Sequence, residues 1–260
     1  MTLLVKLRKT LRAQKQSRNF LVHGTVGLLY IVFRFALTVK ASATSDILRE
    51  AVLLRIFHNR RIHQTTTLTK MDRYPIIFGA CRSYFGESGN LQILSYGCST
   101  GEEVLTLRSY FPSARIVGSE INPKCLKLCR ERKVDDRIVF LDADPSRLLG
   151  ESPFDAIFCM AVLQRTPHTV MADGIRNLSR IYPFEKFNAQ VTELDRLLKR
   201  EGLFVIHHTQ YLFTDASVAG KYSAWEGAPK PTSDGPRFDL RSNLIAGTVL
   251  TPSVYLKIRD

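Results

Sequence analysis

The sequence predicts an α/β fold in which a mostly parallel sheet is flanked by helices and preceded by a helical extension. From about residue 91 the chain alternates short β-rich runs with helical stretches, the pattern of parallel strands joined by right-handed crossovers. Glycines and acidic residues follow the first strands, at the sheet edge where such folds bind ligands. The basic charge is concentrated at the N-terminus, which separates an extension from the main domain.

The composition is that of an ordinary globular protein. Of 260 residues, 45% are hydrophobic and 23% are charged, which excludes a disordered chain, a collagen and a polytopic membrane protein. The cysteines form no C-x-x-C pair and have no histidine cluster beside them, so we expect reduced thiols and no metal site. These cysteines are Cys81, Cys98, Cys125, Cys129 and Cys159.

The charge distribution predicts two parts. Residues 1–70 contain 13 Lys and Arg but only Asp46 and Glu50 as acids, a net charge of +11. The other 190 residues contain 24 basic and 22 acidic residues, a net charge of +2. We therefore expect a basic, partly apolar helical extension over 1–70 and a ligand-binding domain over 71–260. The near-neutral domain argues against nucleic acid as a partner.

The extension contains an apolar run, residues 20–39, which is about long enough to span a bilayer as a helix. Arg34 within the run disfavours spanning, and so does the topology that the preceding basic residues would impose. Two interpretations remain: an interfacial helix that places residues 1–40 on an anionic membrane, and a helix packed on the main domain, which is favoured slightly. An Arg-rich, acid-poor start also fits an organelle transit peptide. Residues 46–64 continue the helical pattern.

The main domain divides into strands and helices by its hydrophobic pattern. The expected strands are 91–96, 114–119, 137–142, 155–160 and 203–208, with 248–258 as a closing strand interrupted by Pro252. The expected helices are 102–110, 123–132 and 186–200, the last followed by a turn at Glu201-Gly202.

The residues after the first strand, Gly97 to Gly101, predict a ligand-binding turn. Glycines at both ends allow a tight turn and a close approach of the backbone to a ligand. Thr100 and Glu103 fit a capping box, so a helix is expected to start here. Its exposed N–H groups would suit a carboxylate or a phosphate.

Acids follow the next two strands. Glu120 lies 23 residues beyond Gly97, a spacing that suits hydrogen bonds from ribose hydroxyls. Asp142, with Ala143, follows the third strand, where an acid can accept from an adenine amino group. The chain has no G-x-G-x-x-G and no G-K-[ST] after the glycines, which disfavours a dinucleotide site and a Walker-type ATP site.

Three stretches resemble the class I S-adenosylmethionine-dependent methyltransferases, and locally the chemotaxis-receptor (CheR-type) members. They are ILSYGCSTGEE (93–103), FDAIFCMAVL (154–163) and GLFVIHHTQ (202–210). The resemblance implies a methyltransferase with a Rossmann-like fold, a mostly parallel seven-stranded sheet and S-adenosylmethionine as cofactor. The unpaired cysteines predict a cytoplasmic protein. The chain departs from the CheR type where that type has Arg-Asn, here Met160-Ala161, and it lacks an evident receptor-docking domain.

The resemblance also implies which residues bind the cofactor. The methionine part is expected at Gly97, Cys98, Ser99 and Gly101, the ribose at Glu120 with Ile121, the adenine at Asp142 and Ala143, and the sulfonium above Cys159 and Met160.

Three histidines are candidates for a general base. His207 and His208 end the fifth strand, and alternation along a strand is expected to send their side chains to opposite faces. We favour His208, which aligns with a histidine of the CheR-type motif. His168 lies in the loop after the fourth strand, which usually borders substrate. Each histidine has an ordinary structural alternative. Three aromatic residues after the fifth strand could either form a substrate wall or belong to the core: Tyr211, Tyr222 and Trp225.

The sequence therefore predicts methyl transfer to a small or lipid-linked acceptor. On the membrane interpretation the enzyme would be peripheral, on the inner face of a membrane. One rival hypothesis is protein carboxylate methylation of the CheR type. Another is a non-catalytic module that binds RNA or a protein partner through its basic arm. The acceptor atom and the oligomeric state are left open by the sequence.

Overall fold

The computed structural model describes residues 45–57, 61–64, 66–86, 88–233 and 235–260. The chain divides into two units, with the boundary between Ile56 and Phe57. Helix α3 (Asp46–Phe57) is nearly all of the described part of the first unit, and none of its residues is buried. Residues 1–40, on which the membrane and packed-helix interpretations depend, lie outside the described residues. None of the helices in the described ranges is long and apolar enough to cross a membrane.

The expectation of a helical pattern through residue 64 is wrong for its last residues, because Ile62 to Gln64 are not helical. Ile62 and His63 are buried. The His63 ring nitrogens lie 2.8 Å from Tyr182 Oη and 3.1 Å from Gln190 Oε1. These tertiary contacts override the helical spacing of the local sequence.

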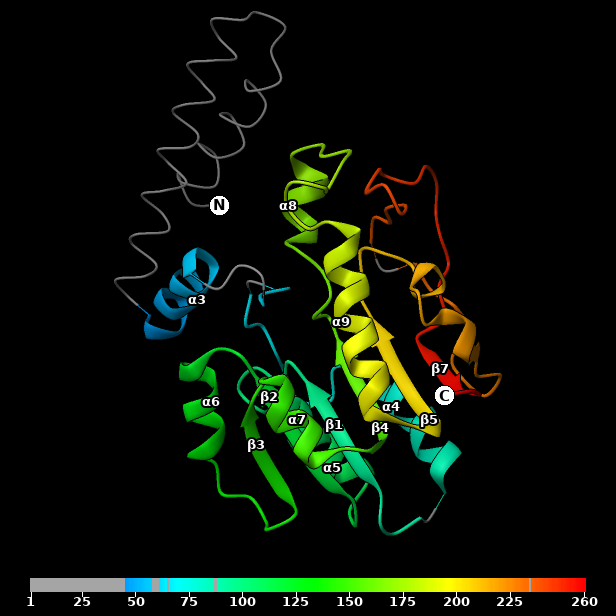
Figure 1. Cartoon of the computed structure of the whole chain (residues 1–260). Coiled ribbons are helices and arrows are strands. Elements are labelled where there is room, and N and C mark those ends of the chain that lie inside the picture. The colour runs from blue at the N-terminus through cyan, green and yellow to red at the C-terminus, as the bar shows by residue number, and fades with distance from the viewer. Residues whose placement is uncertain (1–44, 58–60, 65, 87, 234) are drawn as a thin grey trace, which may run out of the picture. The chain divides into compact units, whose positions relative to one another are not determined.

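The described residues of the second unit form a seven-stranded sheet in the order β3-β2-β1-β4-β5-β7-β6 (Figure 1). Strands β1 to β5 pair in parallel, and β7 is antiparallel to both β5 and β6. This confirms the mostly parallel Rossmann-like sheet of the class I methyltransferase fold. The strands are β1 (Gln92–Tyr96), β2 (Arg115–Glu120), β3 (Ile138–Asp142), β4 (Phe154–Met160), β5 (Leu198–His207), β6 (Tyr222–Ala224) and β7 (Val254–Lys257).

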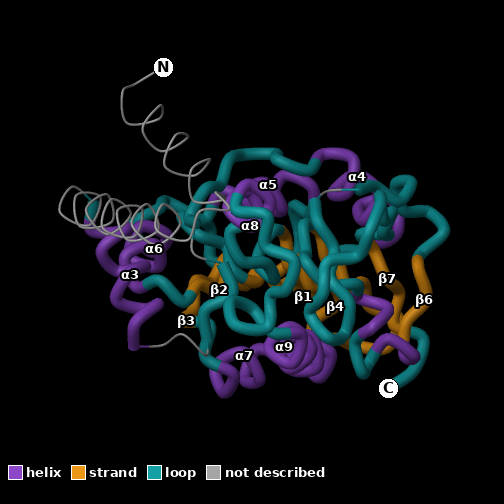
Figure 2. Tube along the Cα trace, turned by 90° about the horizontal axis from the view of Figure 1, so that it is seen from above, coloured by secondary structure: helices purple, strands orange, loops and turns teal. Residues whose placement is uncertain are grey.

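Helices cover both faces of the sheet (Figure 2). One face packs against α4 (Pro75–Phe85), α5 (Glu102–Tyr110) and α6 (Pro123–Arg130), and the other against α7 (Pro145–Glu151) and α9 (Phe184–Leu197). Strand residues alternate between the two cores, since Ile157 belongs to the α9 side and Phe158 to the α4 side. A short helix, α8 (Pro167–Ala172), follows β4.

Two strand boundaries differ from those expected. Helix α9 ends at Leu197 and β5 already begins at Leu198, which is buried and pairs with Phe154. The predicted turn at Glu201-Gly202 therefore lies within a strand, where Glu201 has a φ of 64°. The closing strand is shorter than 248–258 and follows Pro252.

Two of the three aromatic residues after β5 are core residues, whereas Trp225 is half-buried with its ring against that of Tyr84. Tyr211 is fully buried and donates to the Tyr182 carbonyl, and Tyr222 donates to Asp195. The core alternative is therefore confirmed for both, and neither forms an exposed substrate wall.

Candidate functional site

The turn after β1 is built from left-handed backbone positions. Gly97, Ser99 and Gly101 have φ values of 76°, 53° and 94°. A Cβ at Gly97 would lie 2.6 Å from Val162 Cγ2, so only glycine fits that position. The N–H groups of Gly97 and Cys98 both donate to the Ser119 carbonyl, which fixes the turn against the end of β2.

The predicted capping box is wrong. Gly101 is the N-cap residue of α5, and no side chain caps the helix. Thr100 instead donates from Oγ1 to Glu102 Oε2 at 2.6 Å, and Glu103 accepts from Ser95 Oγ at 2.7 Å. Burial raises the pKa of Glu103 to about 7. A half-buried carboxyl with a raised pKa beside this turn is a candidate site residue, which the capping pattern concealed.

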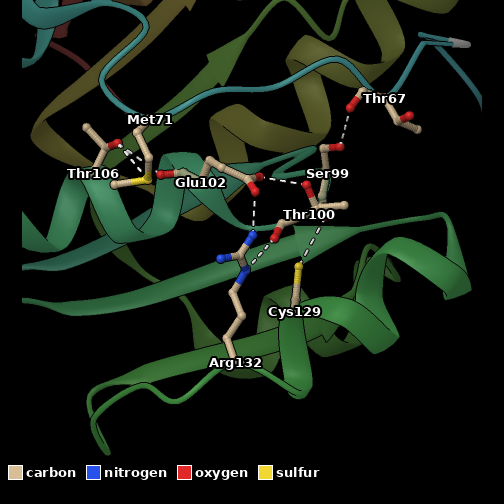
Figure 3. Close-up of polar contacts among 8 residues, drawn as sticks. All are labelled: Thr67, Met71, Ser99, Thr100, Glu102, Thr106, Cys129 and Arg132. Atoms are coloured by element: carbon tan, nitrogen blue, oxygen red, sulfur yellow. Dashed lines mark hydrogen bonds and ion pairs between the residues drawn. The ribbon is translucent and has the colours of Figure 1, made fainter.

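The turn is held from below by α6 and the residues after it (Figure 3). The Arg132 guanidinium pairs with Glu102 and donates from Nε to the Thr100 carbonyl at 2.6 Å. The Cys129 thiol donates to the Ser99 carbonyl at 3.1 Å. These contacts hold Ser99 in its left-handed conformation, which is strained for a residue that has a side chain.

Glu120 lies directly beside the turn, as the spacing predicted. Its Oε2 accepts from the Ser99 N–H and its Oε1 from the Asn122 N–H, both at 2.8 Å. Glu120 is buried, and burial together with the charge of Asp142 raises its pKa although the N–H bonds oppose the shift. A carboxylate can accept about four hydrogen bonds, so it retains capacity for a ribose hydroxyl.

The second predicted acid lies next to the first. Asp142 is paired in register with Glu120, and the Ala143 N–H donates to the Glu120 carbonyl at 3.2 Å. The structure thus brings together the turn, Glu120 and the Asp142–Ala143 pair at the carboxyl ends of β1, β2 and β3. Ile121 follows Glu120 and is half-buried.

A segment outside the predicted motifs contacts these residues. Residues 61–64 and 66–72, called here the crossing segment, contact the loops after β1, β3 and β4. Arg61 donates to the Ala143 carbonyl at 2.9 Å and to Asp142 Oδ1 at 3.3 Å. The Thr67 carbonyl accepts from Ser99 Oγ at 2.8 Å, as Figure 3 shows. No local spacing could have indicated these contacts, because their partners lie 32 to 82 residues away.

Two predicted sulfonium-pocket residues point in different directions. Cys159 is fully buried in the core on the α9 side, whereas Met160 belongs to the core on the α4 side. Strand alternation therefore prevents both side chains from lining one pocket. Cys98 is also buried in the α4-side core, so it contributes its backbone, and not its side chain, to the surface of the turn.

The predicted separation of His207 and His208 is wrong. Their ring centroids lie 4.2 Å apart, and Tyr74 packs against both rings. Strand β5 ends at His207 and His208 has a φ of 54°, so the alternation stops between them. The His207 Nδ1 lies 2.8 Å from Ser253 Oγ. His168 lies on α8 and takes part in none of these contacts.

The loops after β4 and β5 are tied together beside the histidines. The Ala161 N–H donates to the His207 carbonyl at 2.9 Å. Gln210 accepts from the Arg165 N–H at 2.7 Å and donates to the Arg165 carbonyl at 3.2 Å. The carboxyl ends of the strands therefore carry two groups of contacts, one after β1 to β3 around Glu120 and one after β4 and β5 around the histidines.

Residues 93–183 match the family model of the methyltransferase domain. Among curated proteins, the chain is 36% identical over 99 residues to a tRNA (guanine-N(7)-)-methyltransferase of Chloroflexus aggregans, which covers 37% of this chain and 42% of the relative. It is 34% identical over 77 residues to a trans-aconitate 2-methyltransferase of Methylobacterium nodulans, covering 30% and 29%. The chain thus spans less than half the length of these relatives.

Solved structures with a similar arrangement include two proteins at low identity. The plantazolicin methyltransferase BpumL, in complex with a monoazolic desmethylPZN analog and SAH, has 13% identity and a TM-score of 0.37, and the match covers 79% of this chain and 62% of that one. YjhP from E. coli has 17% identity and a TM-score of 0.36, covering 61% and 55%.

Proposed function

We propose that this chain, whose residues 93–183 are a methyltransferase domain on a class I fold, transfers the methyl group of S-adenosylmethionine to a small-molecule acceptor. The observation that carries the proposal is the Glu120 carboxylate at the end of β2, hydrogen-bonded at 2.8 Å to the glycine-bounded turn. That arrangement suits a ribose at Glu120 with an adenine beside Asp142.

The residues of the site suit the cofactor in its separate parts. The turn from Gly97 to Gly101 would hold the methionine part, Glu120 the ribose and Asp142 the adenine amino group. When bound, the cofactor supplies an electrophilic methyl group on a positively charged sulfur. The chain would supply alignment and exclusion of water, which are the main requirements of an in-line displacement.

The histidine pair is proposed to act on the acceptor. His207 lies in register with Met160 and is oriented by Ser253, while Tyr74 packs against both His207 and His208. A base here would accept the proton of a hydroxyl acceptor. We retain His208 as the first candidate and His207 as the second, and His168 as a residue of the acceptor-side loop.

Calorimetry with S-adenosylhomocysteine tests the cofactor proposal. Micromolar binding is expected for the wild type, with a loss of at least tenfold in Glu120→Ala. Glu131→Ala is the matched control, because Glu131 is an exposed acid at the end of α6. Absence of binding to folded wild-type protein would exclude the methyltransferase proposal.

The acceptor class is tested by product analysis. The two relatives are named for tRNA and for trans-aconitate, so both compounds belong in the first assay. The near-neutral main domain favours the small molecule. Methylation of tRNA without methylation of trans-aconitate would contradict the choice of a small-molecule acceptor.

Two finer hypotheses concern other acceptors. A lipid-linked acceptor would give the basic residues 1–40 a role at an anionic membrane, and it requires that full-length protein co-sediments with anionic liposomes more than protein lacking residues 1–40. Protein carboxylate methylation, suggested by the 93–103 stretch, requires a base-labile methyl ester on a protein product.

A further inference from the structure

A basic cluster lies on the acceptor side of the site, formed by Arg165, Lys186 and His63. Arg165 follows β4 and is only 4% exposed. Lys186 lies in the first turns of α9 and is half-buried. His63 belongs to the crossing segment and is buried against Tyr182 and Gln190.

The Arg165 guanidinium and the Lys186 ammonium converge on one atom. The Ile62 carbonyl accepts from Arg165 Nη2 at 2.9 Å and from Lys186 Nζ at 2.5 Å. Because both groups donate to this one oxygen, the guanidinium and the ammonium lie close to each other. The geometry is therefore that of a fork that presents a guanidinium and an ammonium side by side.

The electrostatic environment of this fork is positive. Burial and the charge of Arg165 lower the pKa of Lys186 to about 8. Burial, with the charges of Lys186 and Arg165, lowers the pKa of His63 to about 3, so His63 is neutral at pH 7. Like charges held close in a partly dry site attract an anion strongly.

The fork is placed where an acceptor would lie. Arg165 is in the loop that begins at Ala161, which is hydrogen-bonded to His207. Gln210 ties the backbone of Arg165 to the loop after β5. Arg165 and the histidine pair therefore belong to two loops that are hydrogen-bonded to each other, and Lys186 joins Arg165 from α9.

We infer that Arg165 and Lys186 bind a carboxylate of the methyl acceptor, which makes the acceptor a small carboxylic acid. A planar guanidinium matches a carboxylate with two parallel hydrogen bonds, and the ammonium adds a point charge. This inference rests on the proposed methyl transfer, and it adds the chemical class of the acceptor.

Citrate is the probe, titrated by calorimetry into protein saturated with S-adenosylhomocysteine. We expect a Kd at or below about 1 mM for the wild type, at least tenfold weaker binding to Lys186→Gln, and little change in Lys186→Arg. Lys199→Gln is the matched control, because Lys199 pairs with Asp155 on β4 and is 41% exposed. Uncharged triethyl citrate is expected not to bind.

The pH profile is a second readout. Lys186 faces Arg165, His63 and the Tyr182 ring, whose centroid lies 6.0 Å from Nζ. Citrate affinity is expected to fall as the pH rises above 8, since Lys186 then loses its proton, and to fall less in Lys186→Arg.

The outcomes separate this inference from the proposed function. If the protein binds S-adenosylhomocysteine but not citrate, the inference is overturned and the methyltransferase proposal stays intact. The same holds if citrate and its triethyl ester bind equally. Unchanged citrate binding in folded Lys186→Gln also overturns it and makes the cluster a structural tie for Ile62. Failure to bind S-adenosylhomocysteine overturns the proposed function itself.

Discussion

The Glu120 carboxylate accepts a 2.8 Å hydrogen bond from the Ser99 N–H, which joins the end of β2 to the turn after β1. The acid that would hold the ribose is thereby oriented by the same turn that would hold the methionine part. The two parts of the site are positioned as one unit, so a change at Glu120 is expected to affect the turn as well.

Cofactor affinity is expected to fall as the pH is lowered. The pKa of Glu120 is raised by burial and by Asp142, and the ionised carboxylate is the better acceptor of ribose hydroxyls. Calorimetry with S-adenosylhomocysteine from pH 8 to pH 5 measures the loss. Glu120→Gln, which cannot titrate there, is expected to show weaker binding and a flatter profile. Constant wild-type affinity over this range would contradict the ribose assignment.

Glu103→Gln is expected to stabilise the protein at alkaline pH. The pKa of Glu103 rises from 4.5 in the unfolded chain to about 7 in the folded protein. Below pH 4.5 the carboxyl is protonated in both states and the fold keeps its full stability. This stability is lost as the pH rises through 7, because the carboxyl must then ionise in the folded protein. The loss amounts to about 3 kcal/mol. Urea unfolding at pH 5 and pH 8 should show variant and wild type closer at pH 5 and the variant more stable at pH 8. A variant less stable than the wild type at pH 8 would contradict the raised pKa of Glu103.

Arg61→Ala is expected to weaken cofactor binding modestly. Arg61 holds the crossing segment against Asp142 and Ala143, but the ion pair is 44% and 40% exposed. Such pairs contribute about 0.2–1 kcal/mol, which is at most about fivefold in Kd. The effect should shrink at high salt. Arg137→Ala is the control, because Arg137 is an exposed arginine before β3. Equal cofactor affinities of the two variants would show that the Arg61 contacts do not support cofactor binding.

Asp195→Asn is expected to destabilise the fold while sparing the site. Asp195 is buried and bonded to Tyr222 and Lys221, and it lies 3.1 Å from the buried Lys257 Nζ. Leaving Lys257 without its buried partner should lower the free energy of unfolding by about 3 kcal/mol. The exposed Asp135→Asn should change it little. Affinity for S-adenosylhomocysteine at 25 °C is expected to stay unchanged in both.

The strands were predictable because their signal is local. The buried runs at β1 to β5 alternate with turn residues, and parallel pairing brings the residues after each run to one edge of the sheet. Glu120 and Asp142 were therefore found from spacing, and the structure pairs them in register. Histidine orientation could not be found this way, because one left-handed residue, His208, ends the alternation.

The sequence by itself determined the class of fold, the ligand turn and the order of the acids along the chain. These follow from hydrophobic periodicity and from glycine chemistry, which act within a few residues. The tertiary structure decided which distant groups meet. Arg61 reaches Ala143, and Arg165 and Lys186 share the Ile62 carbonyl, across separations of 82, 103 and 124 residues. No local pattern encodes such contacts, since they depend on how the loops after separate strands are packed together.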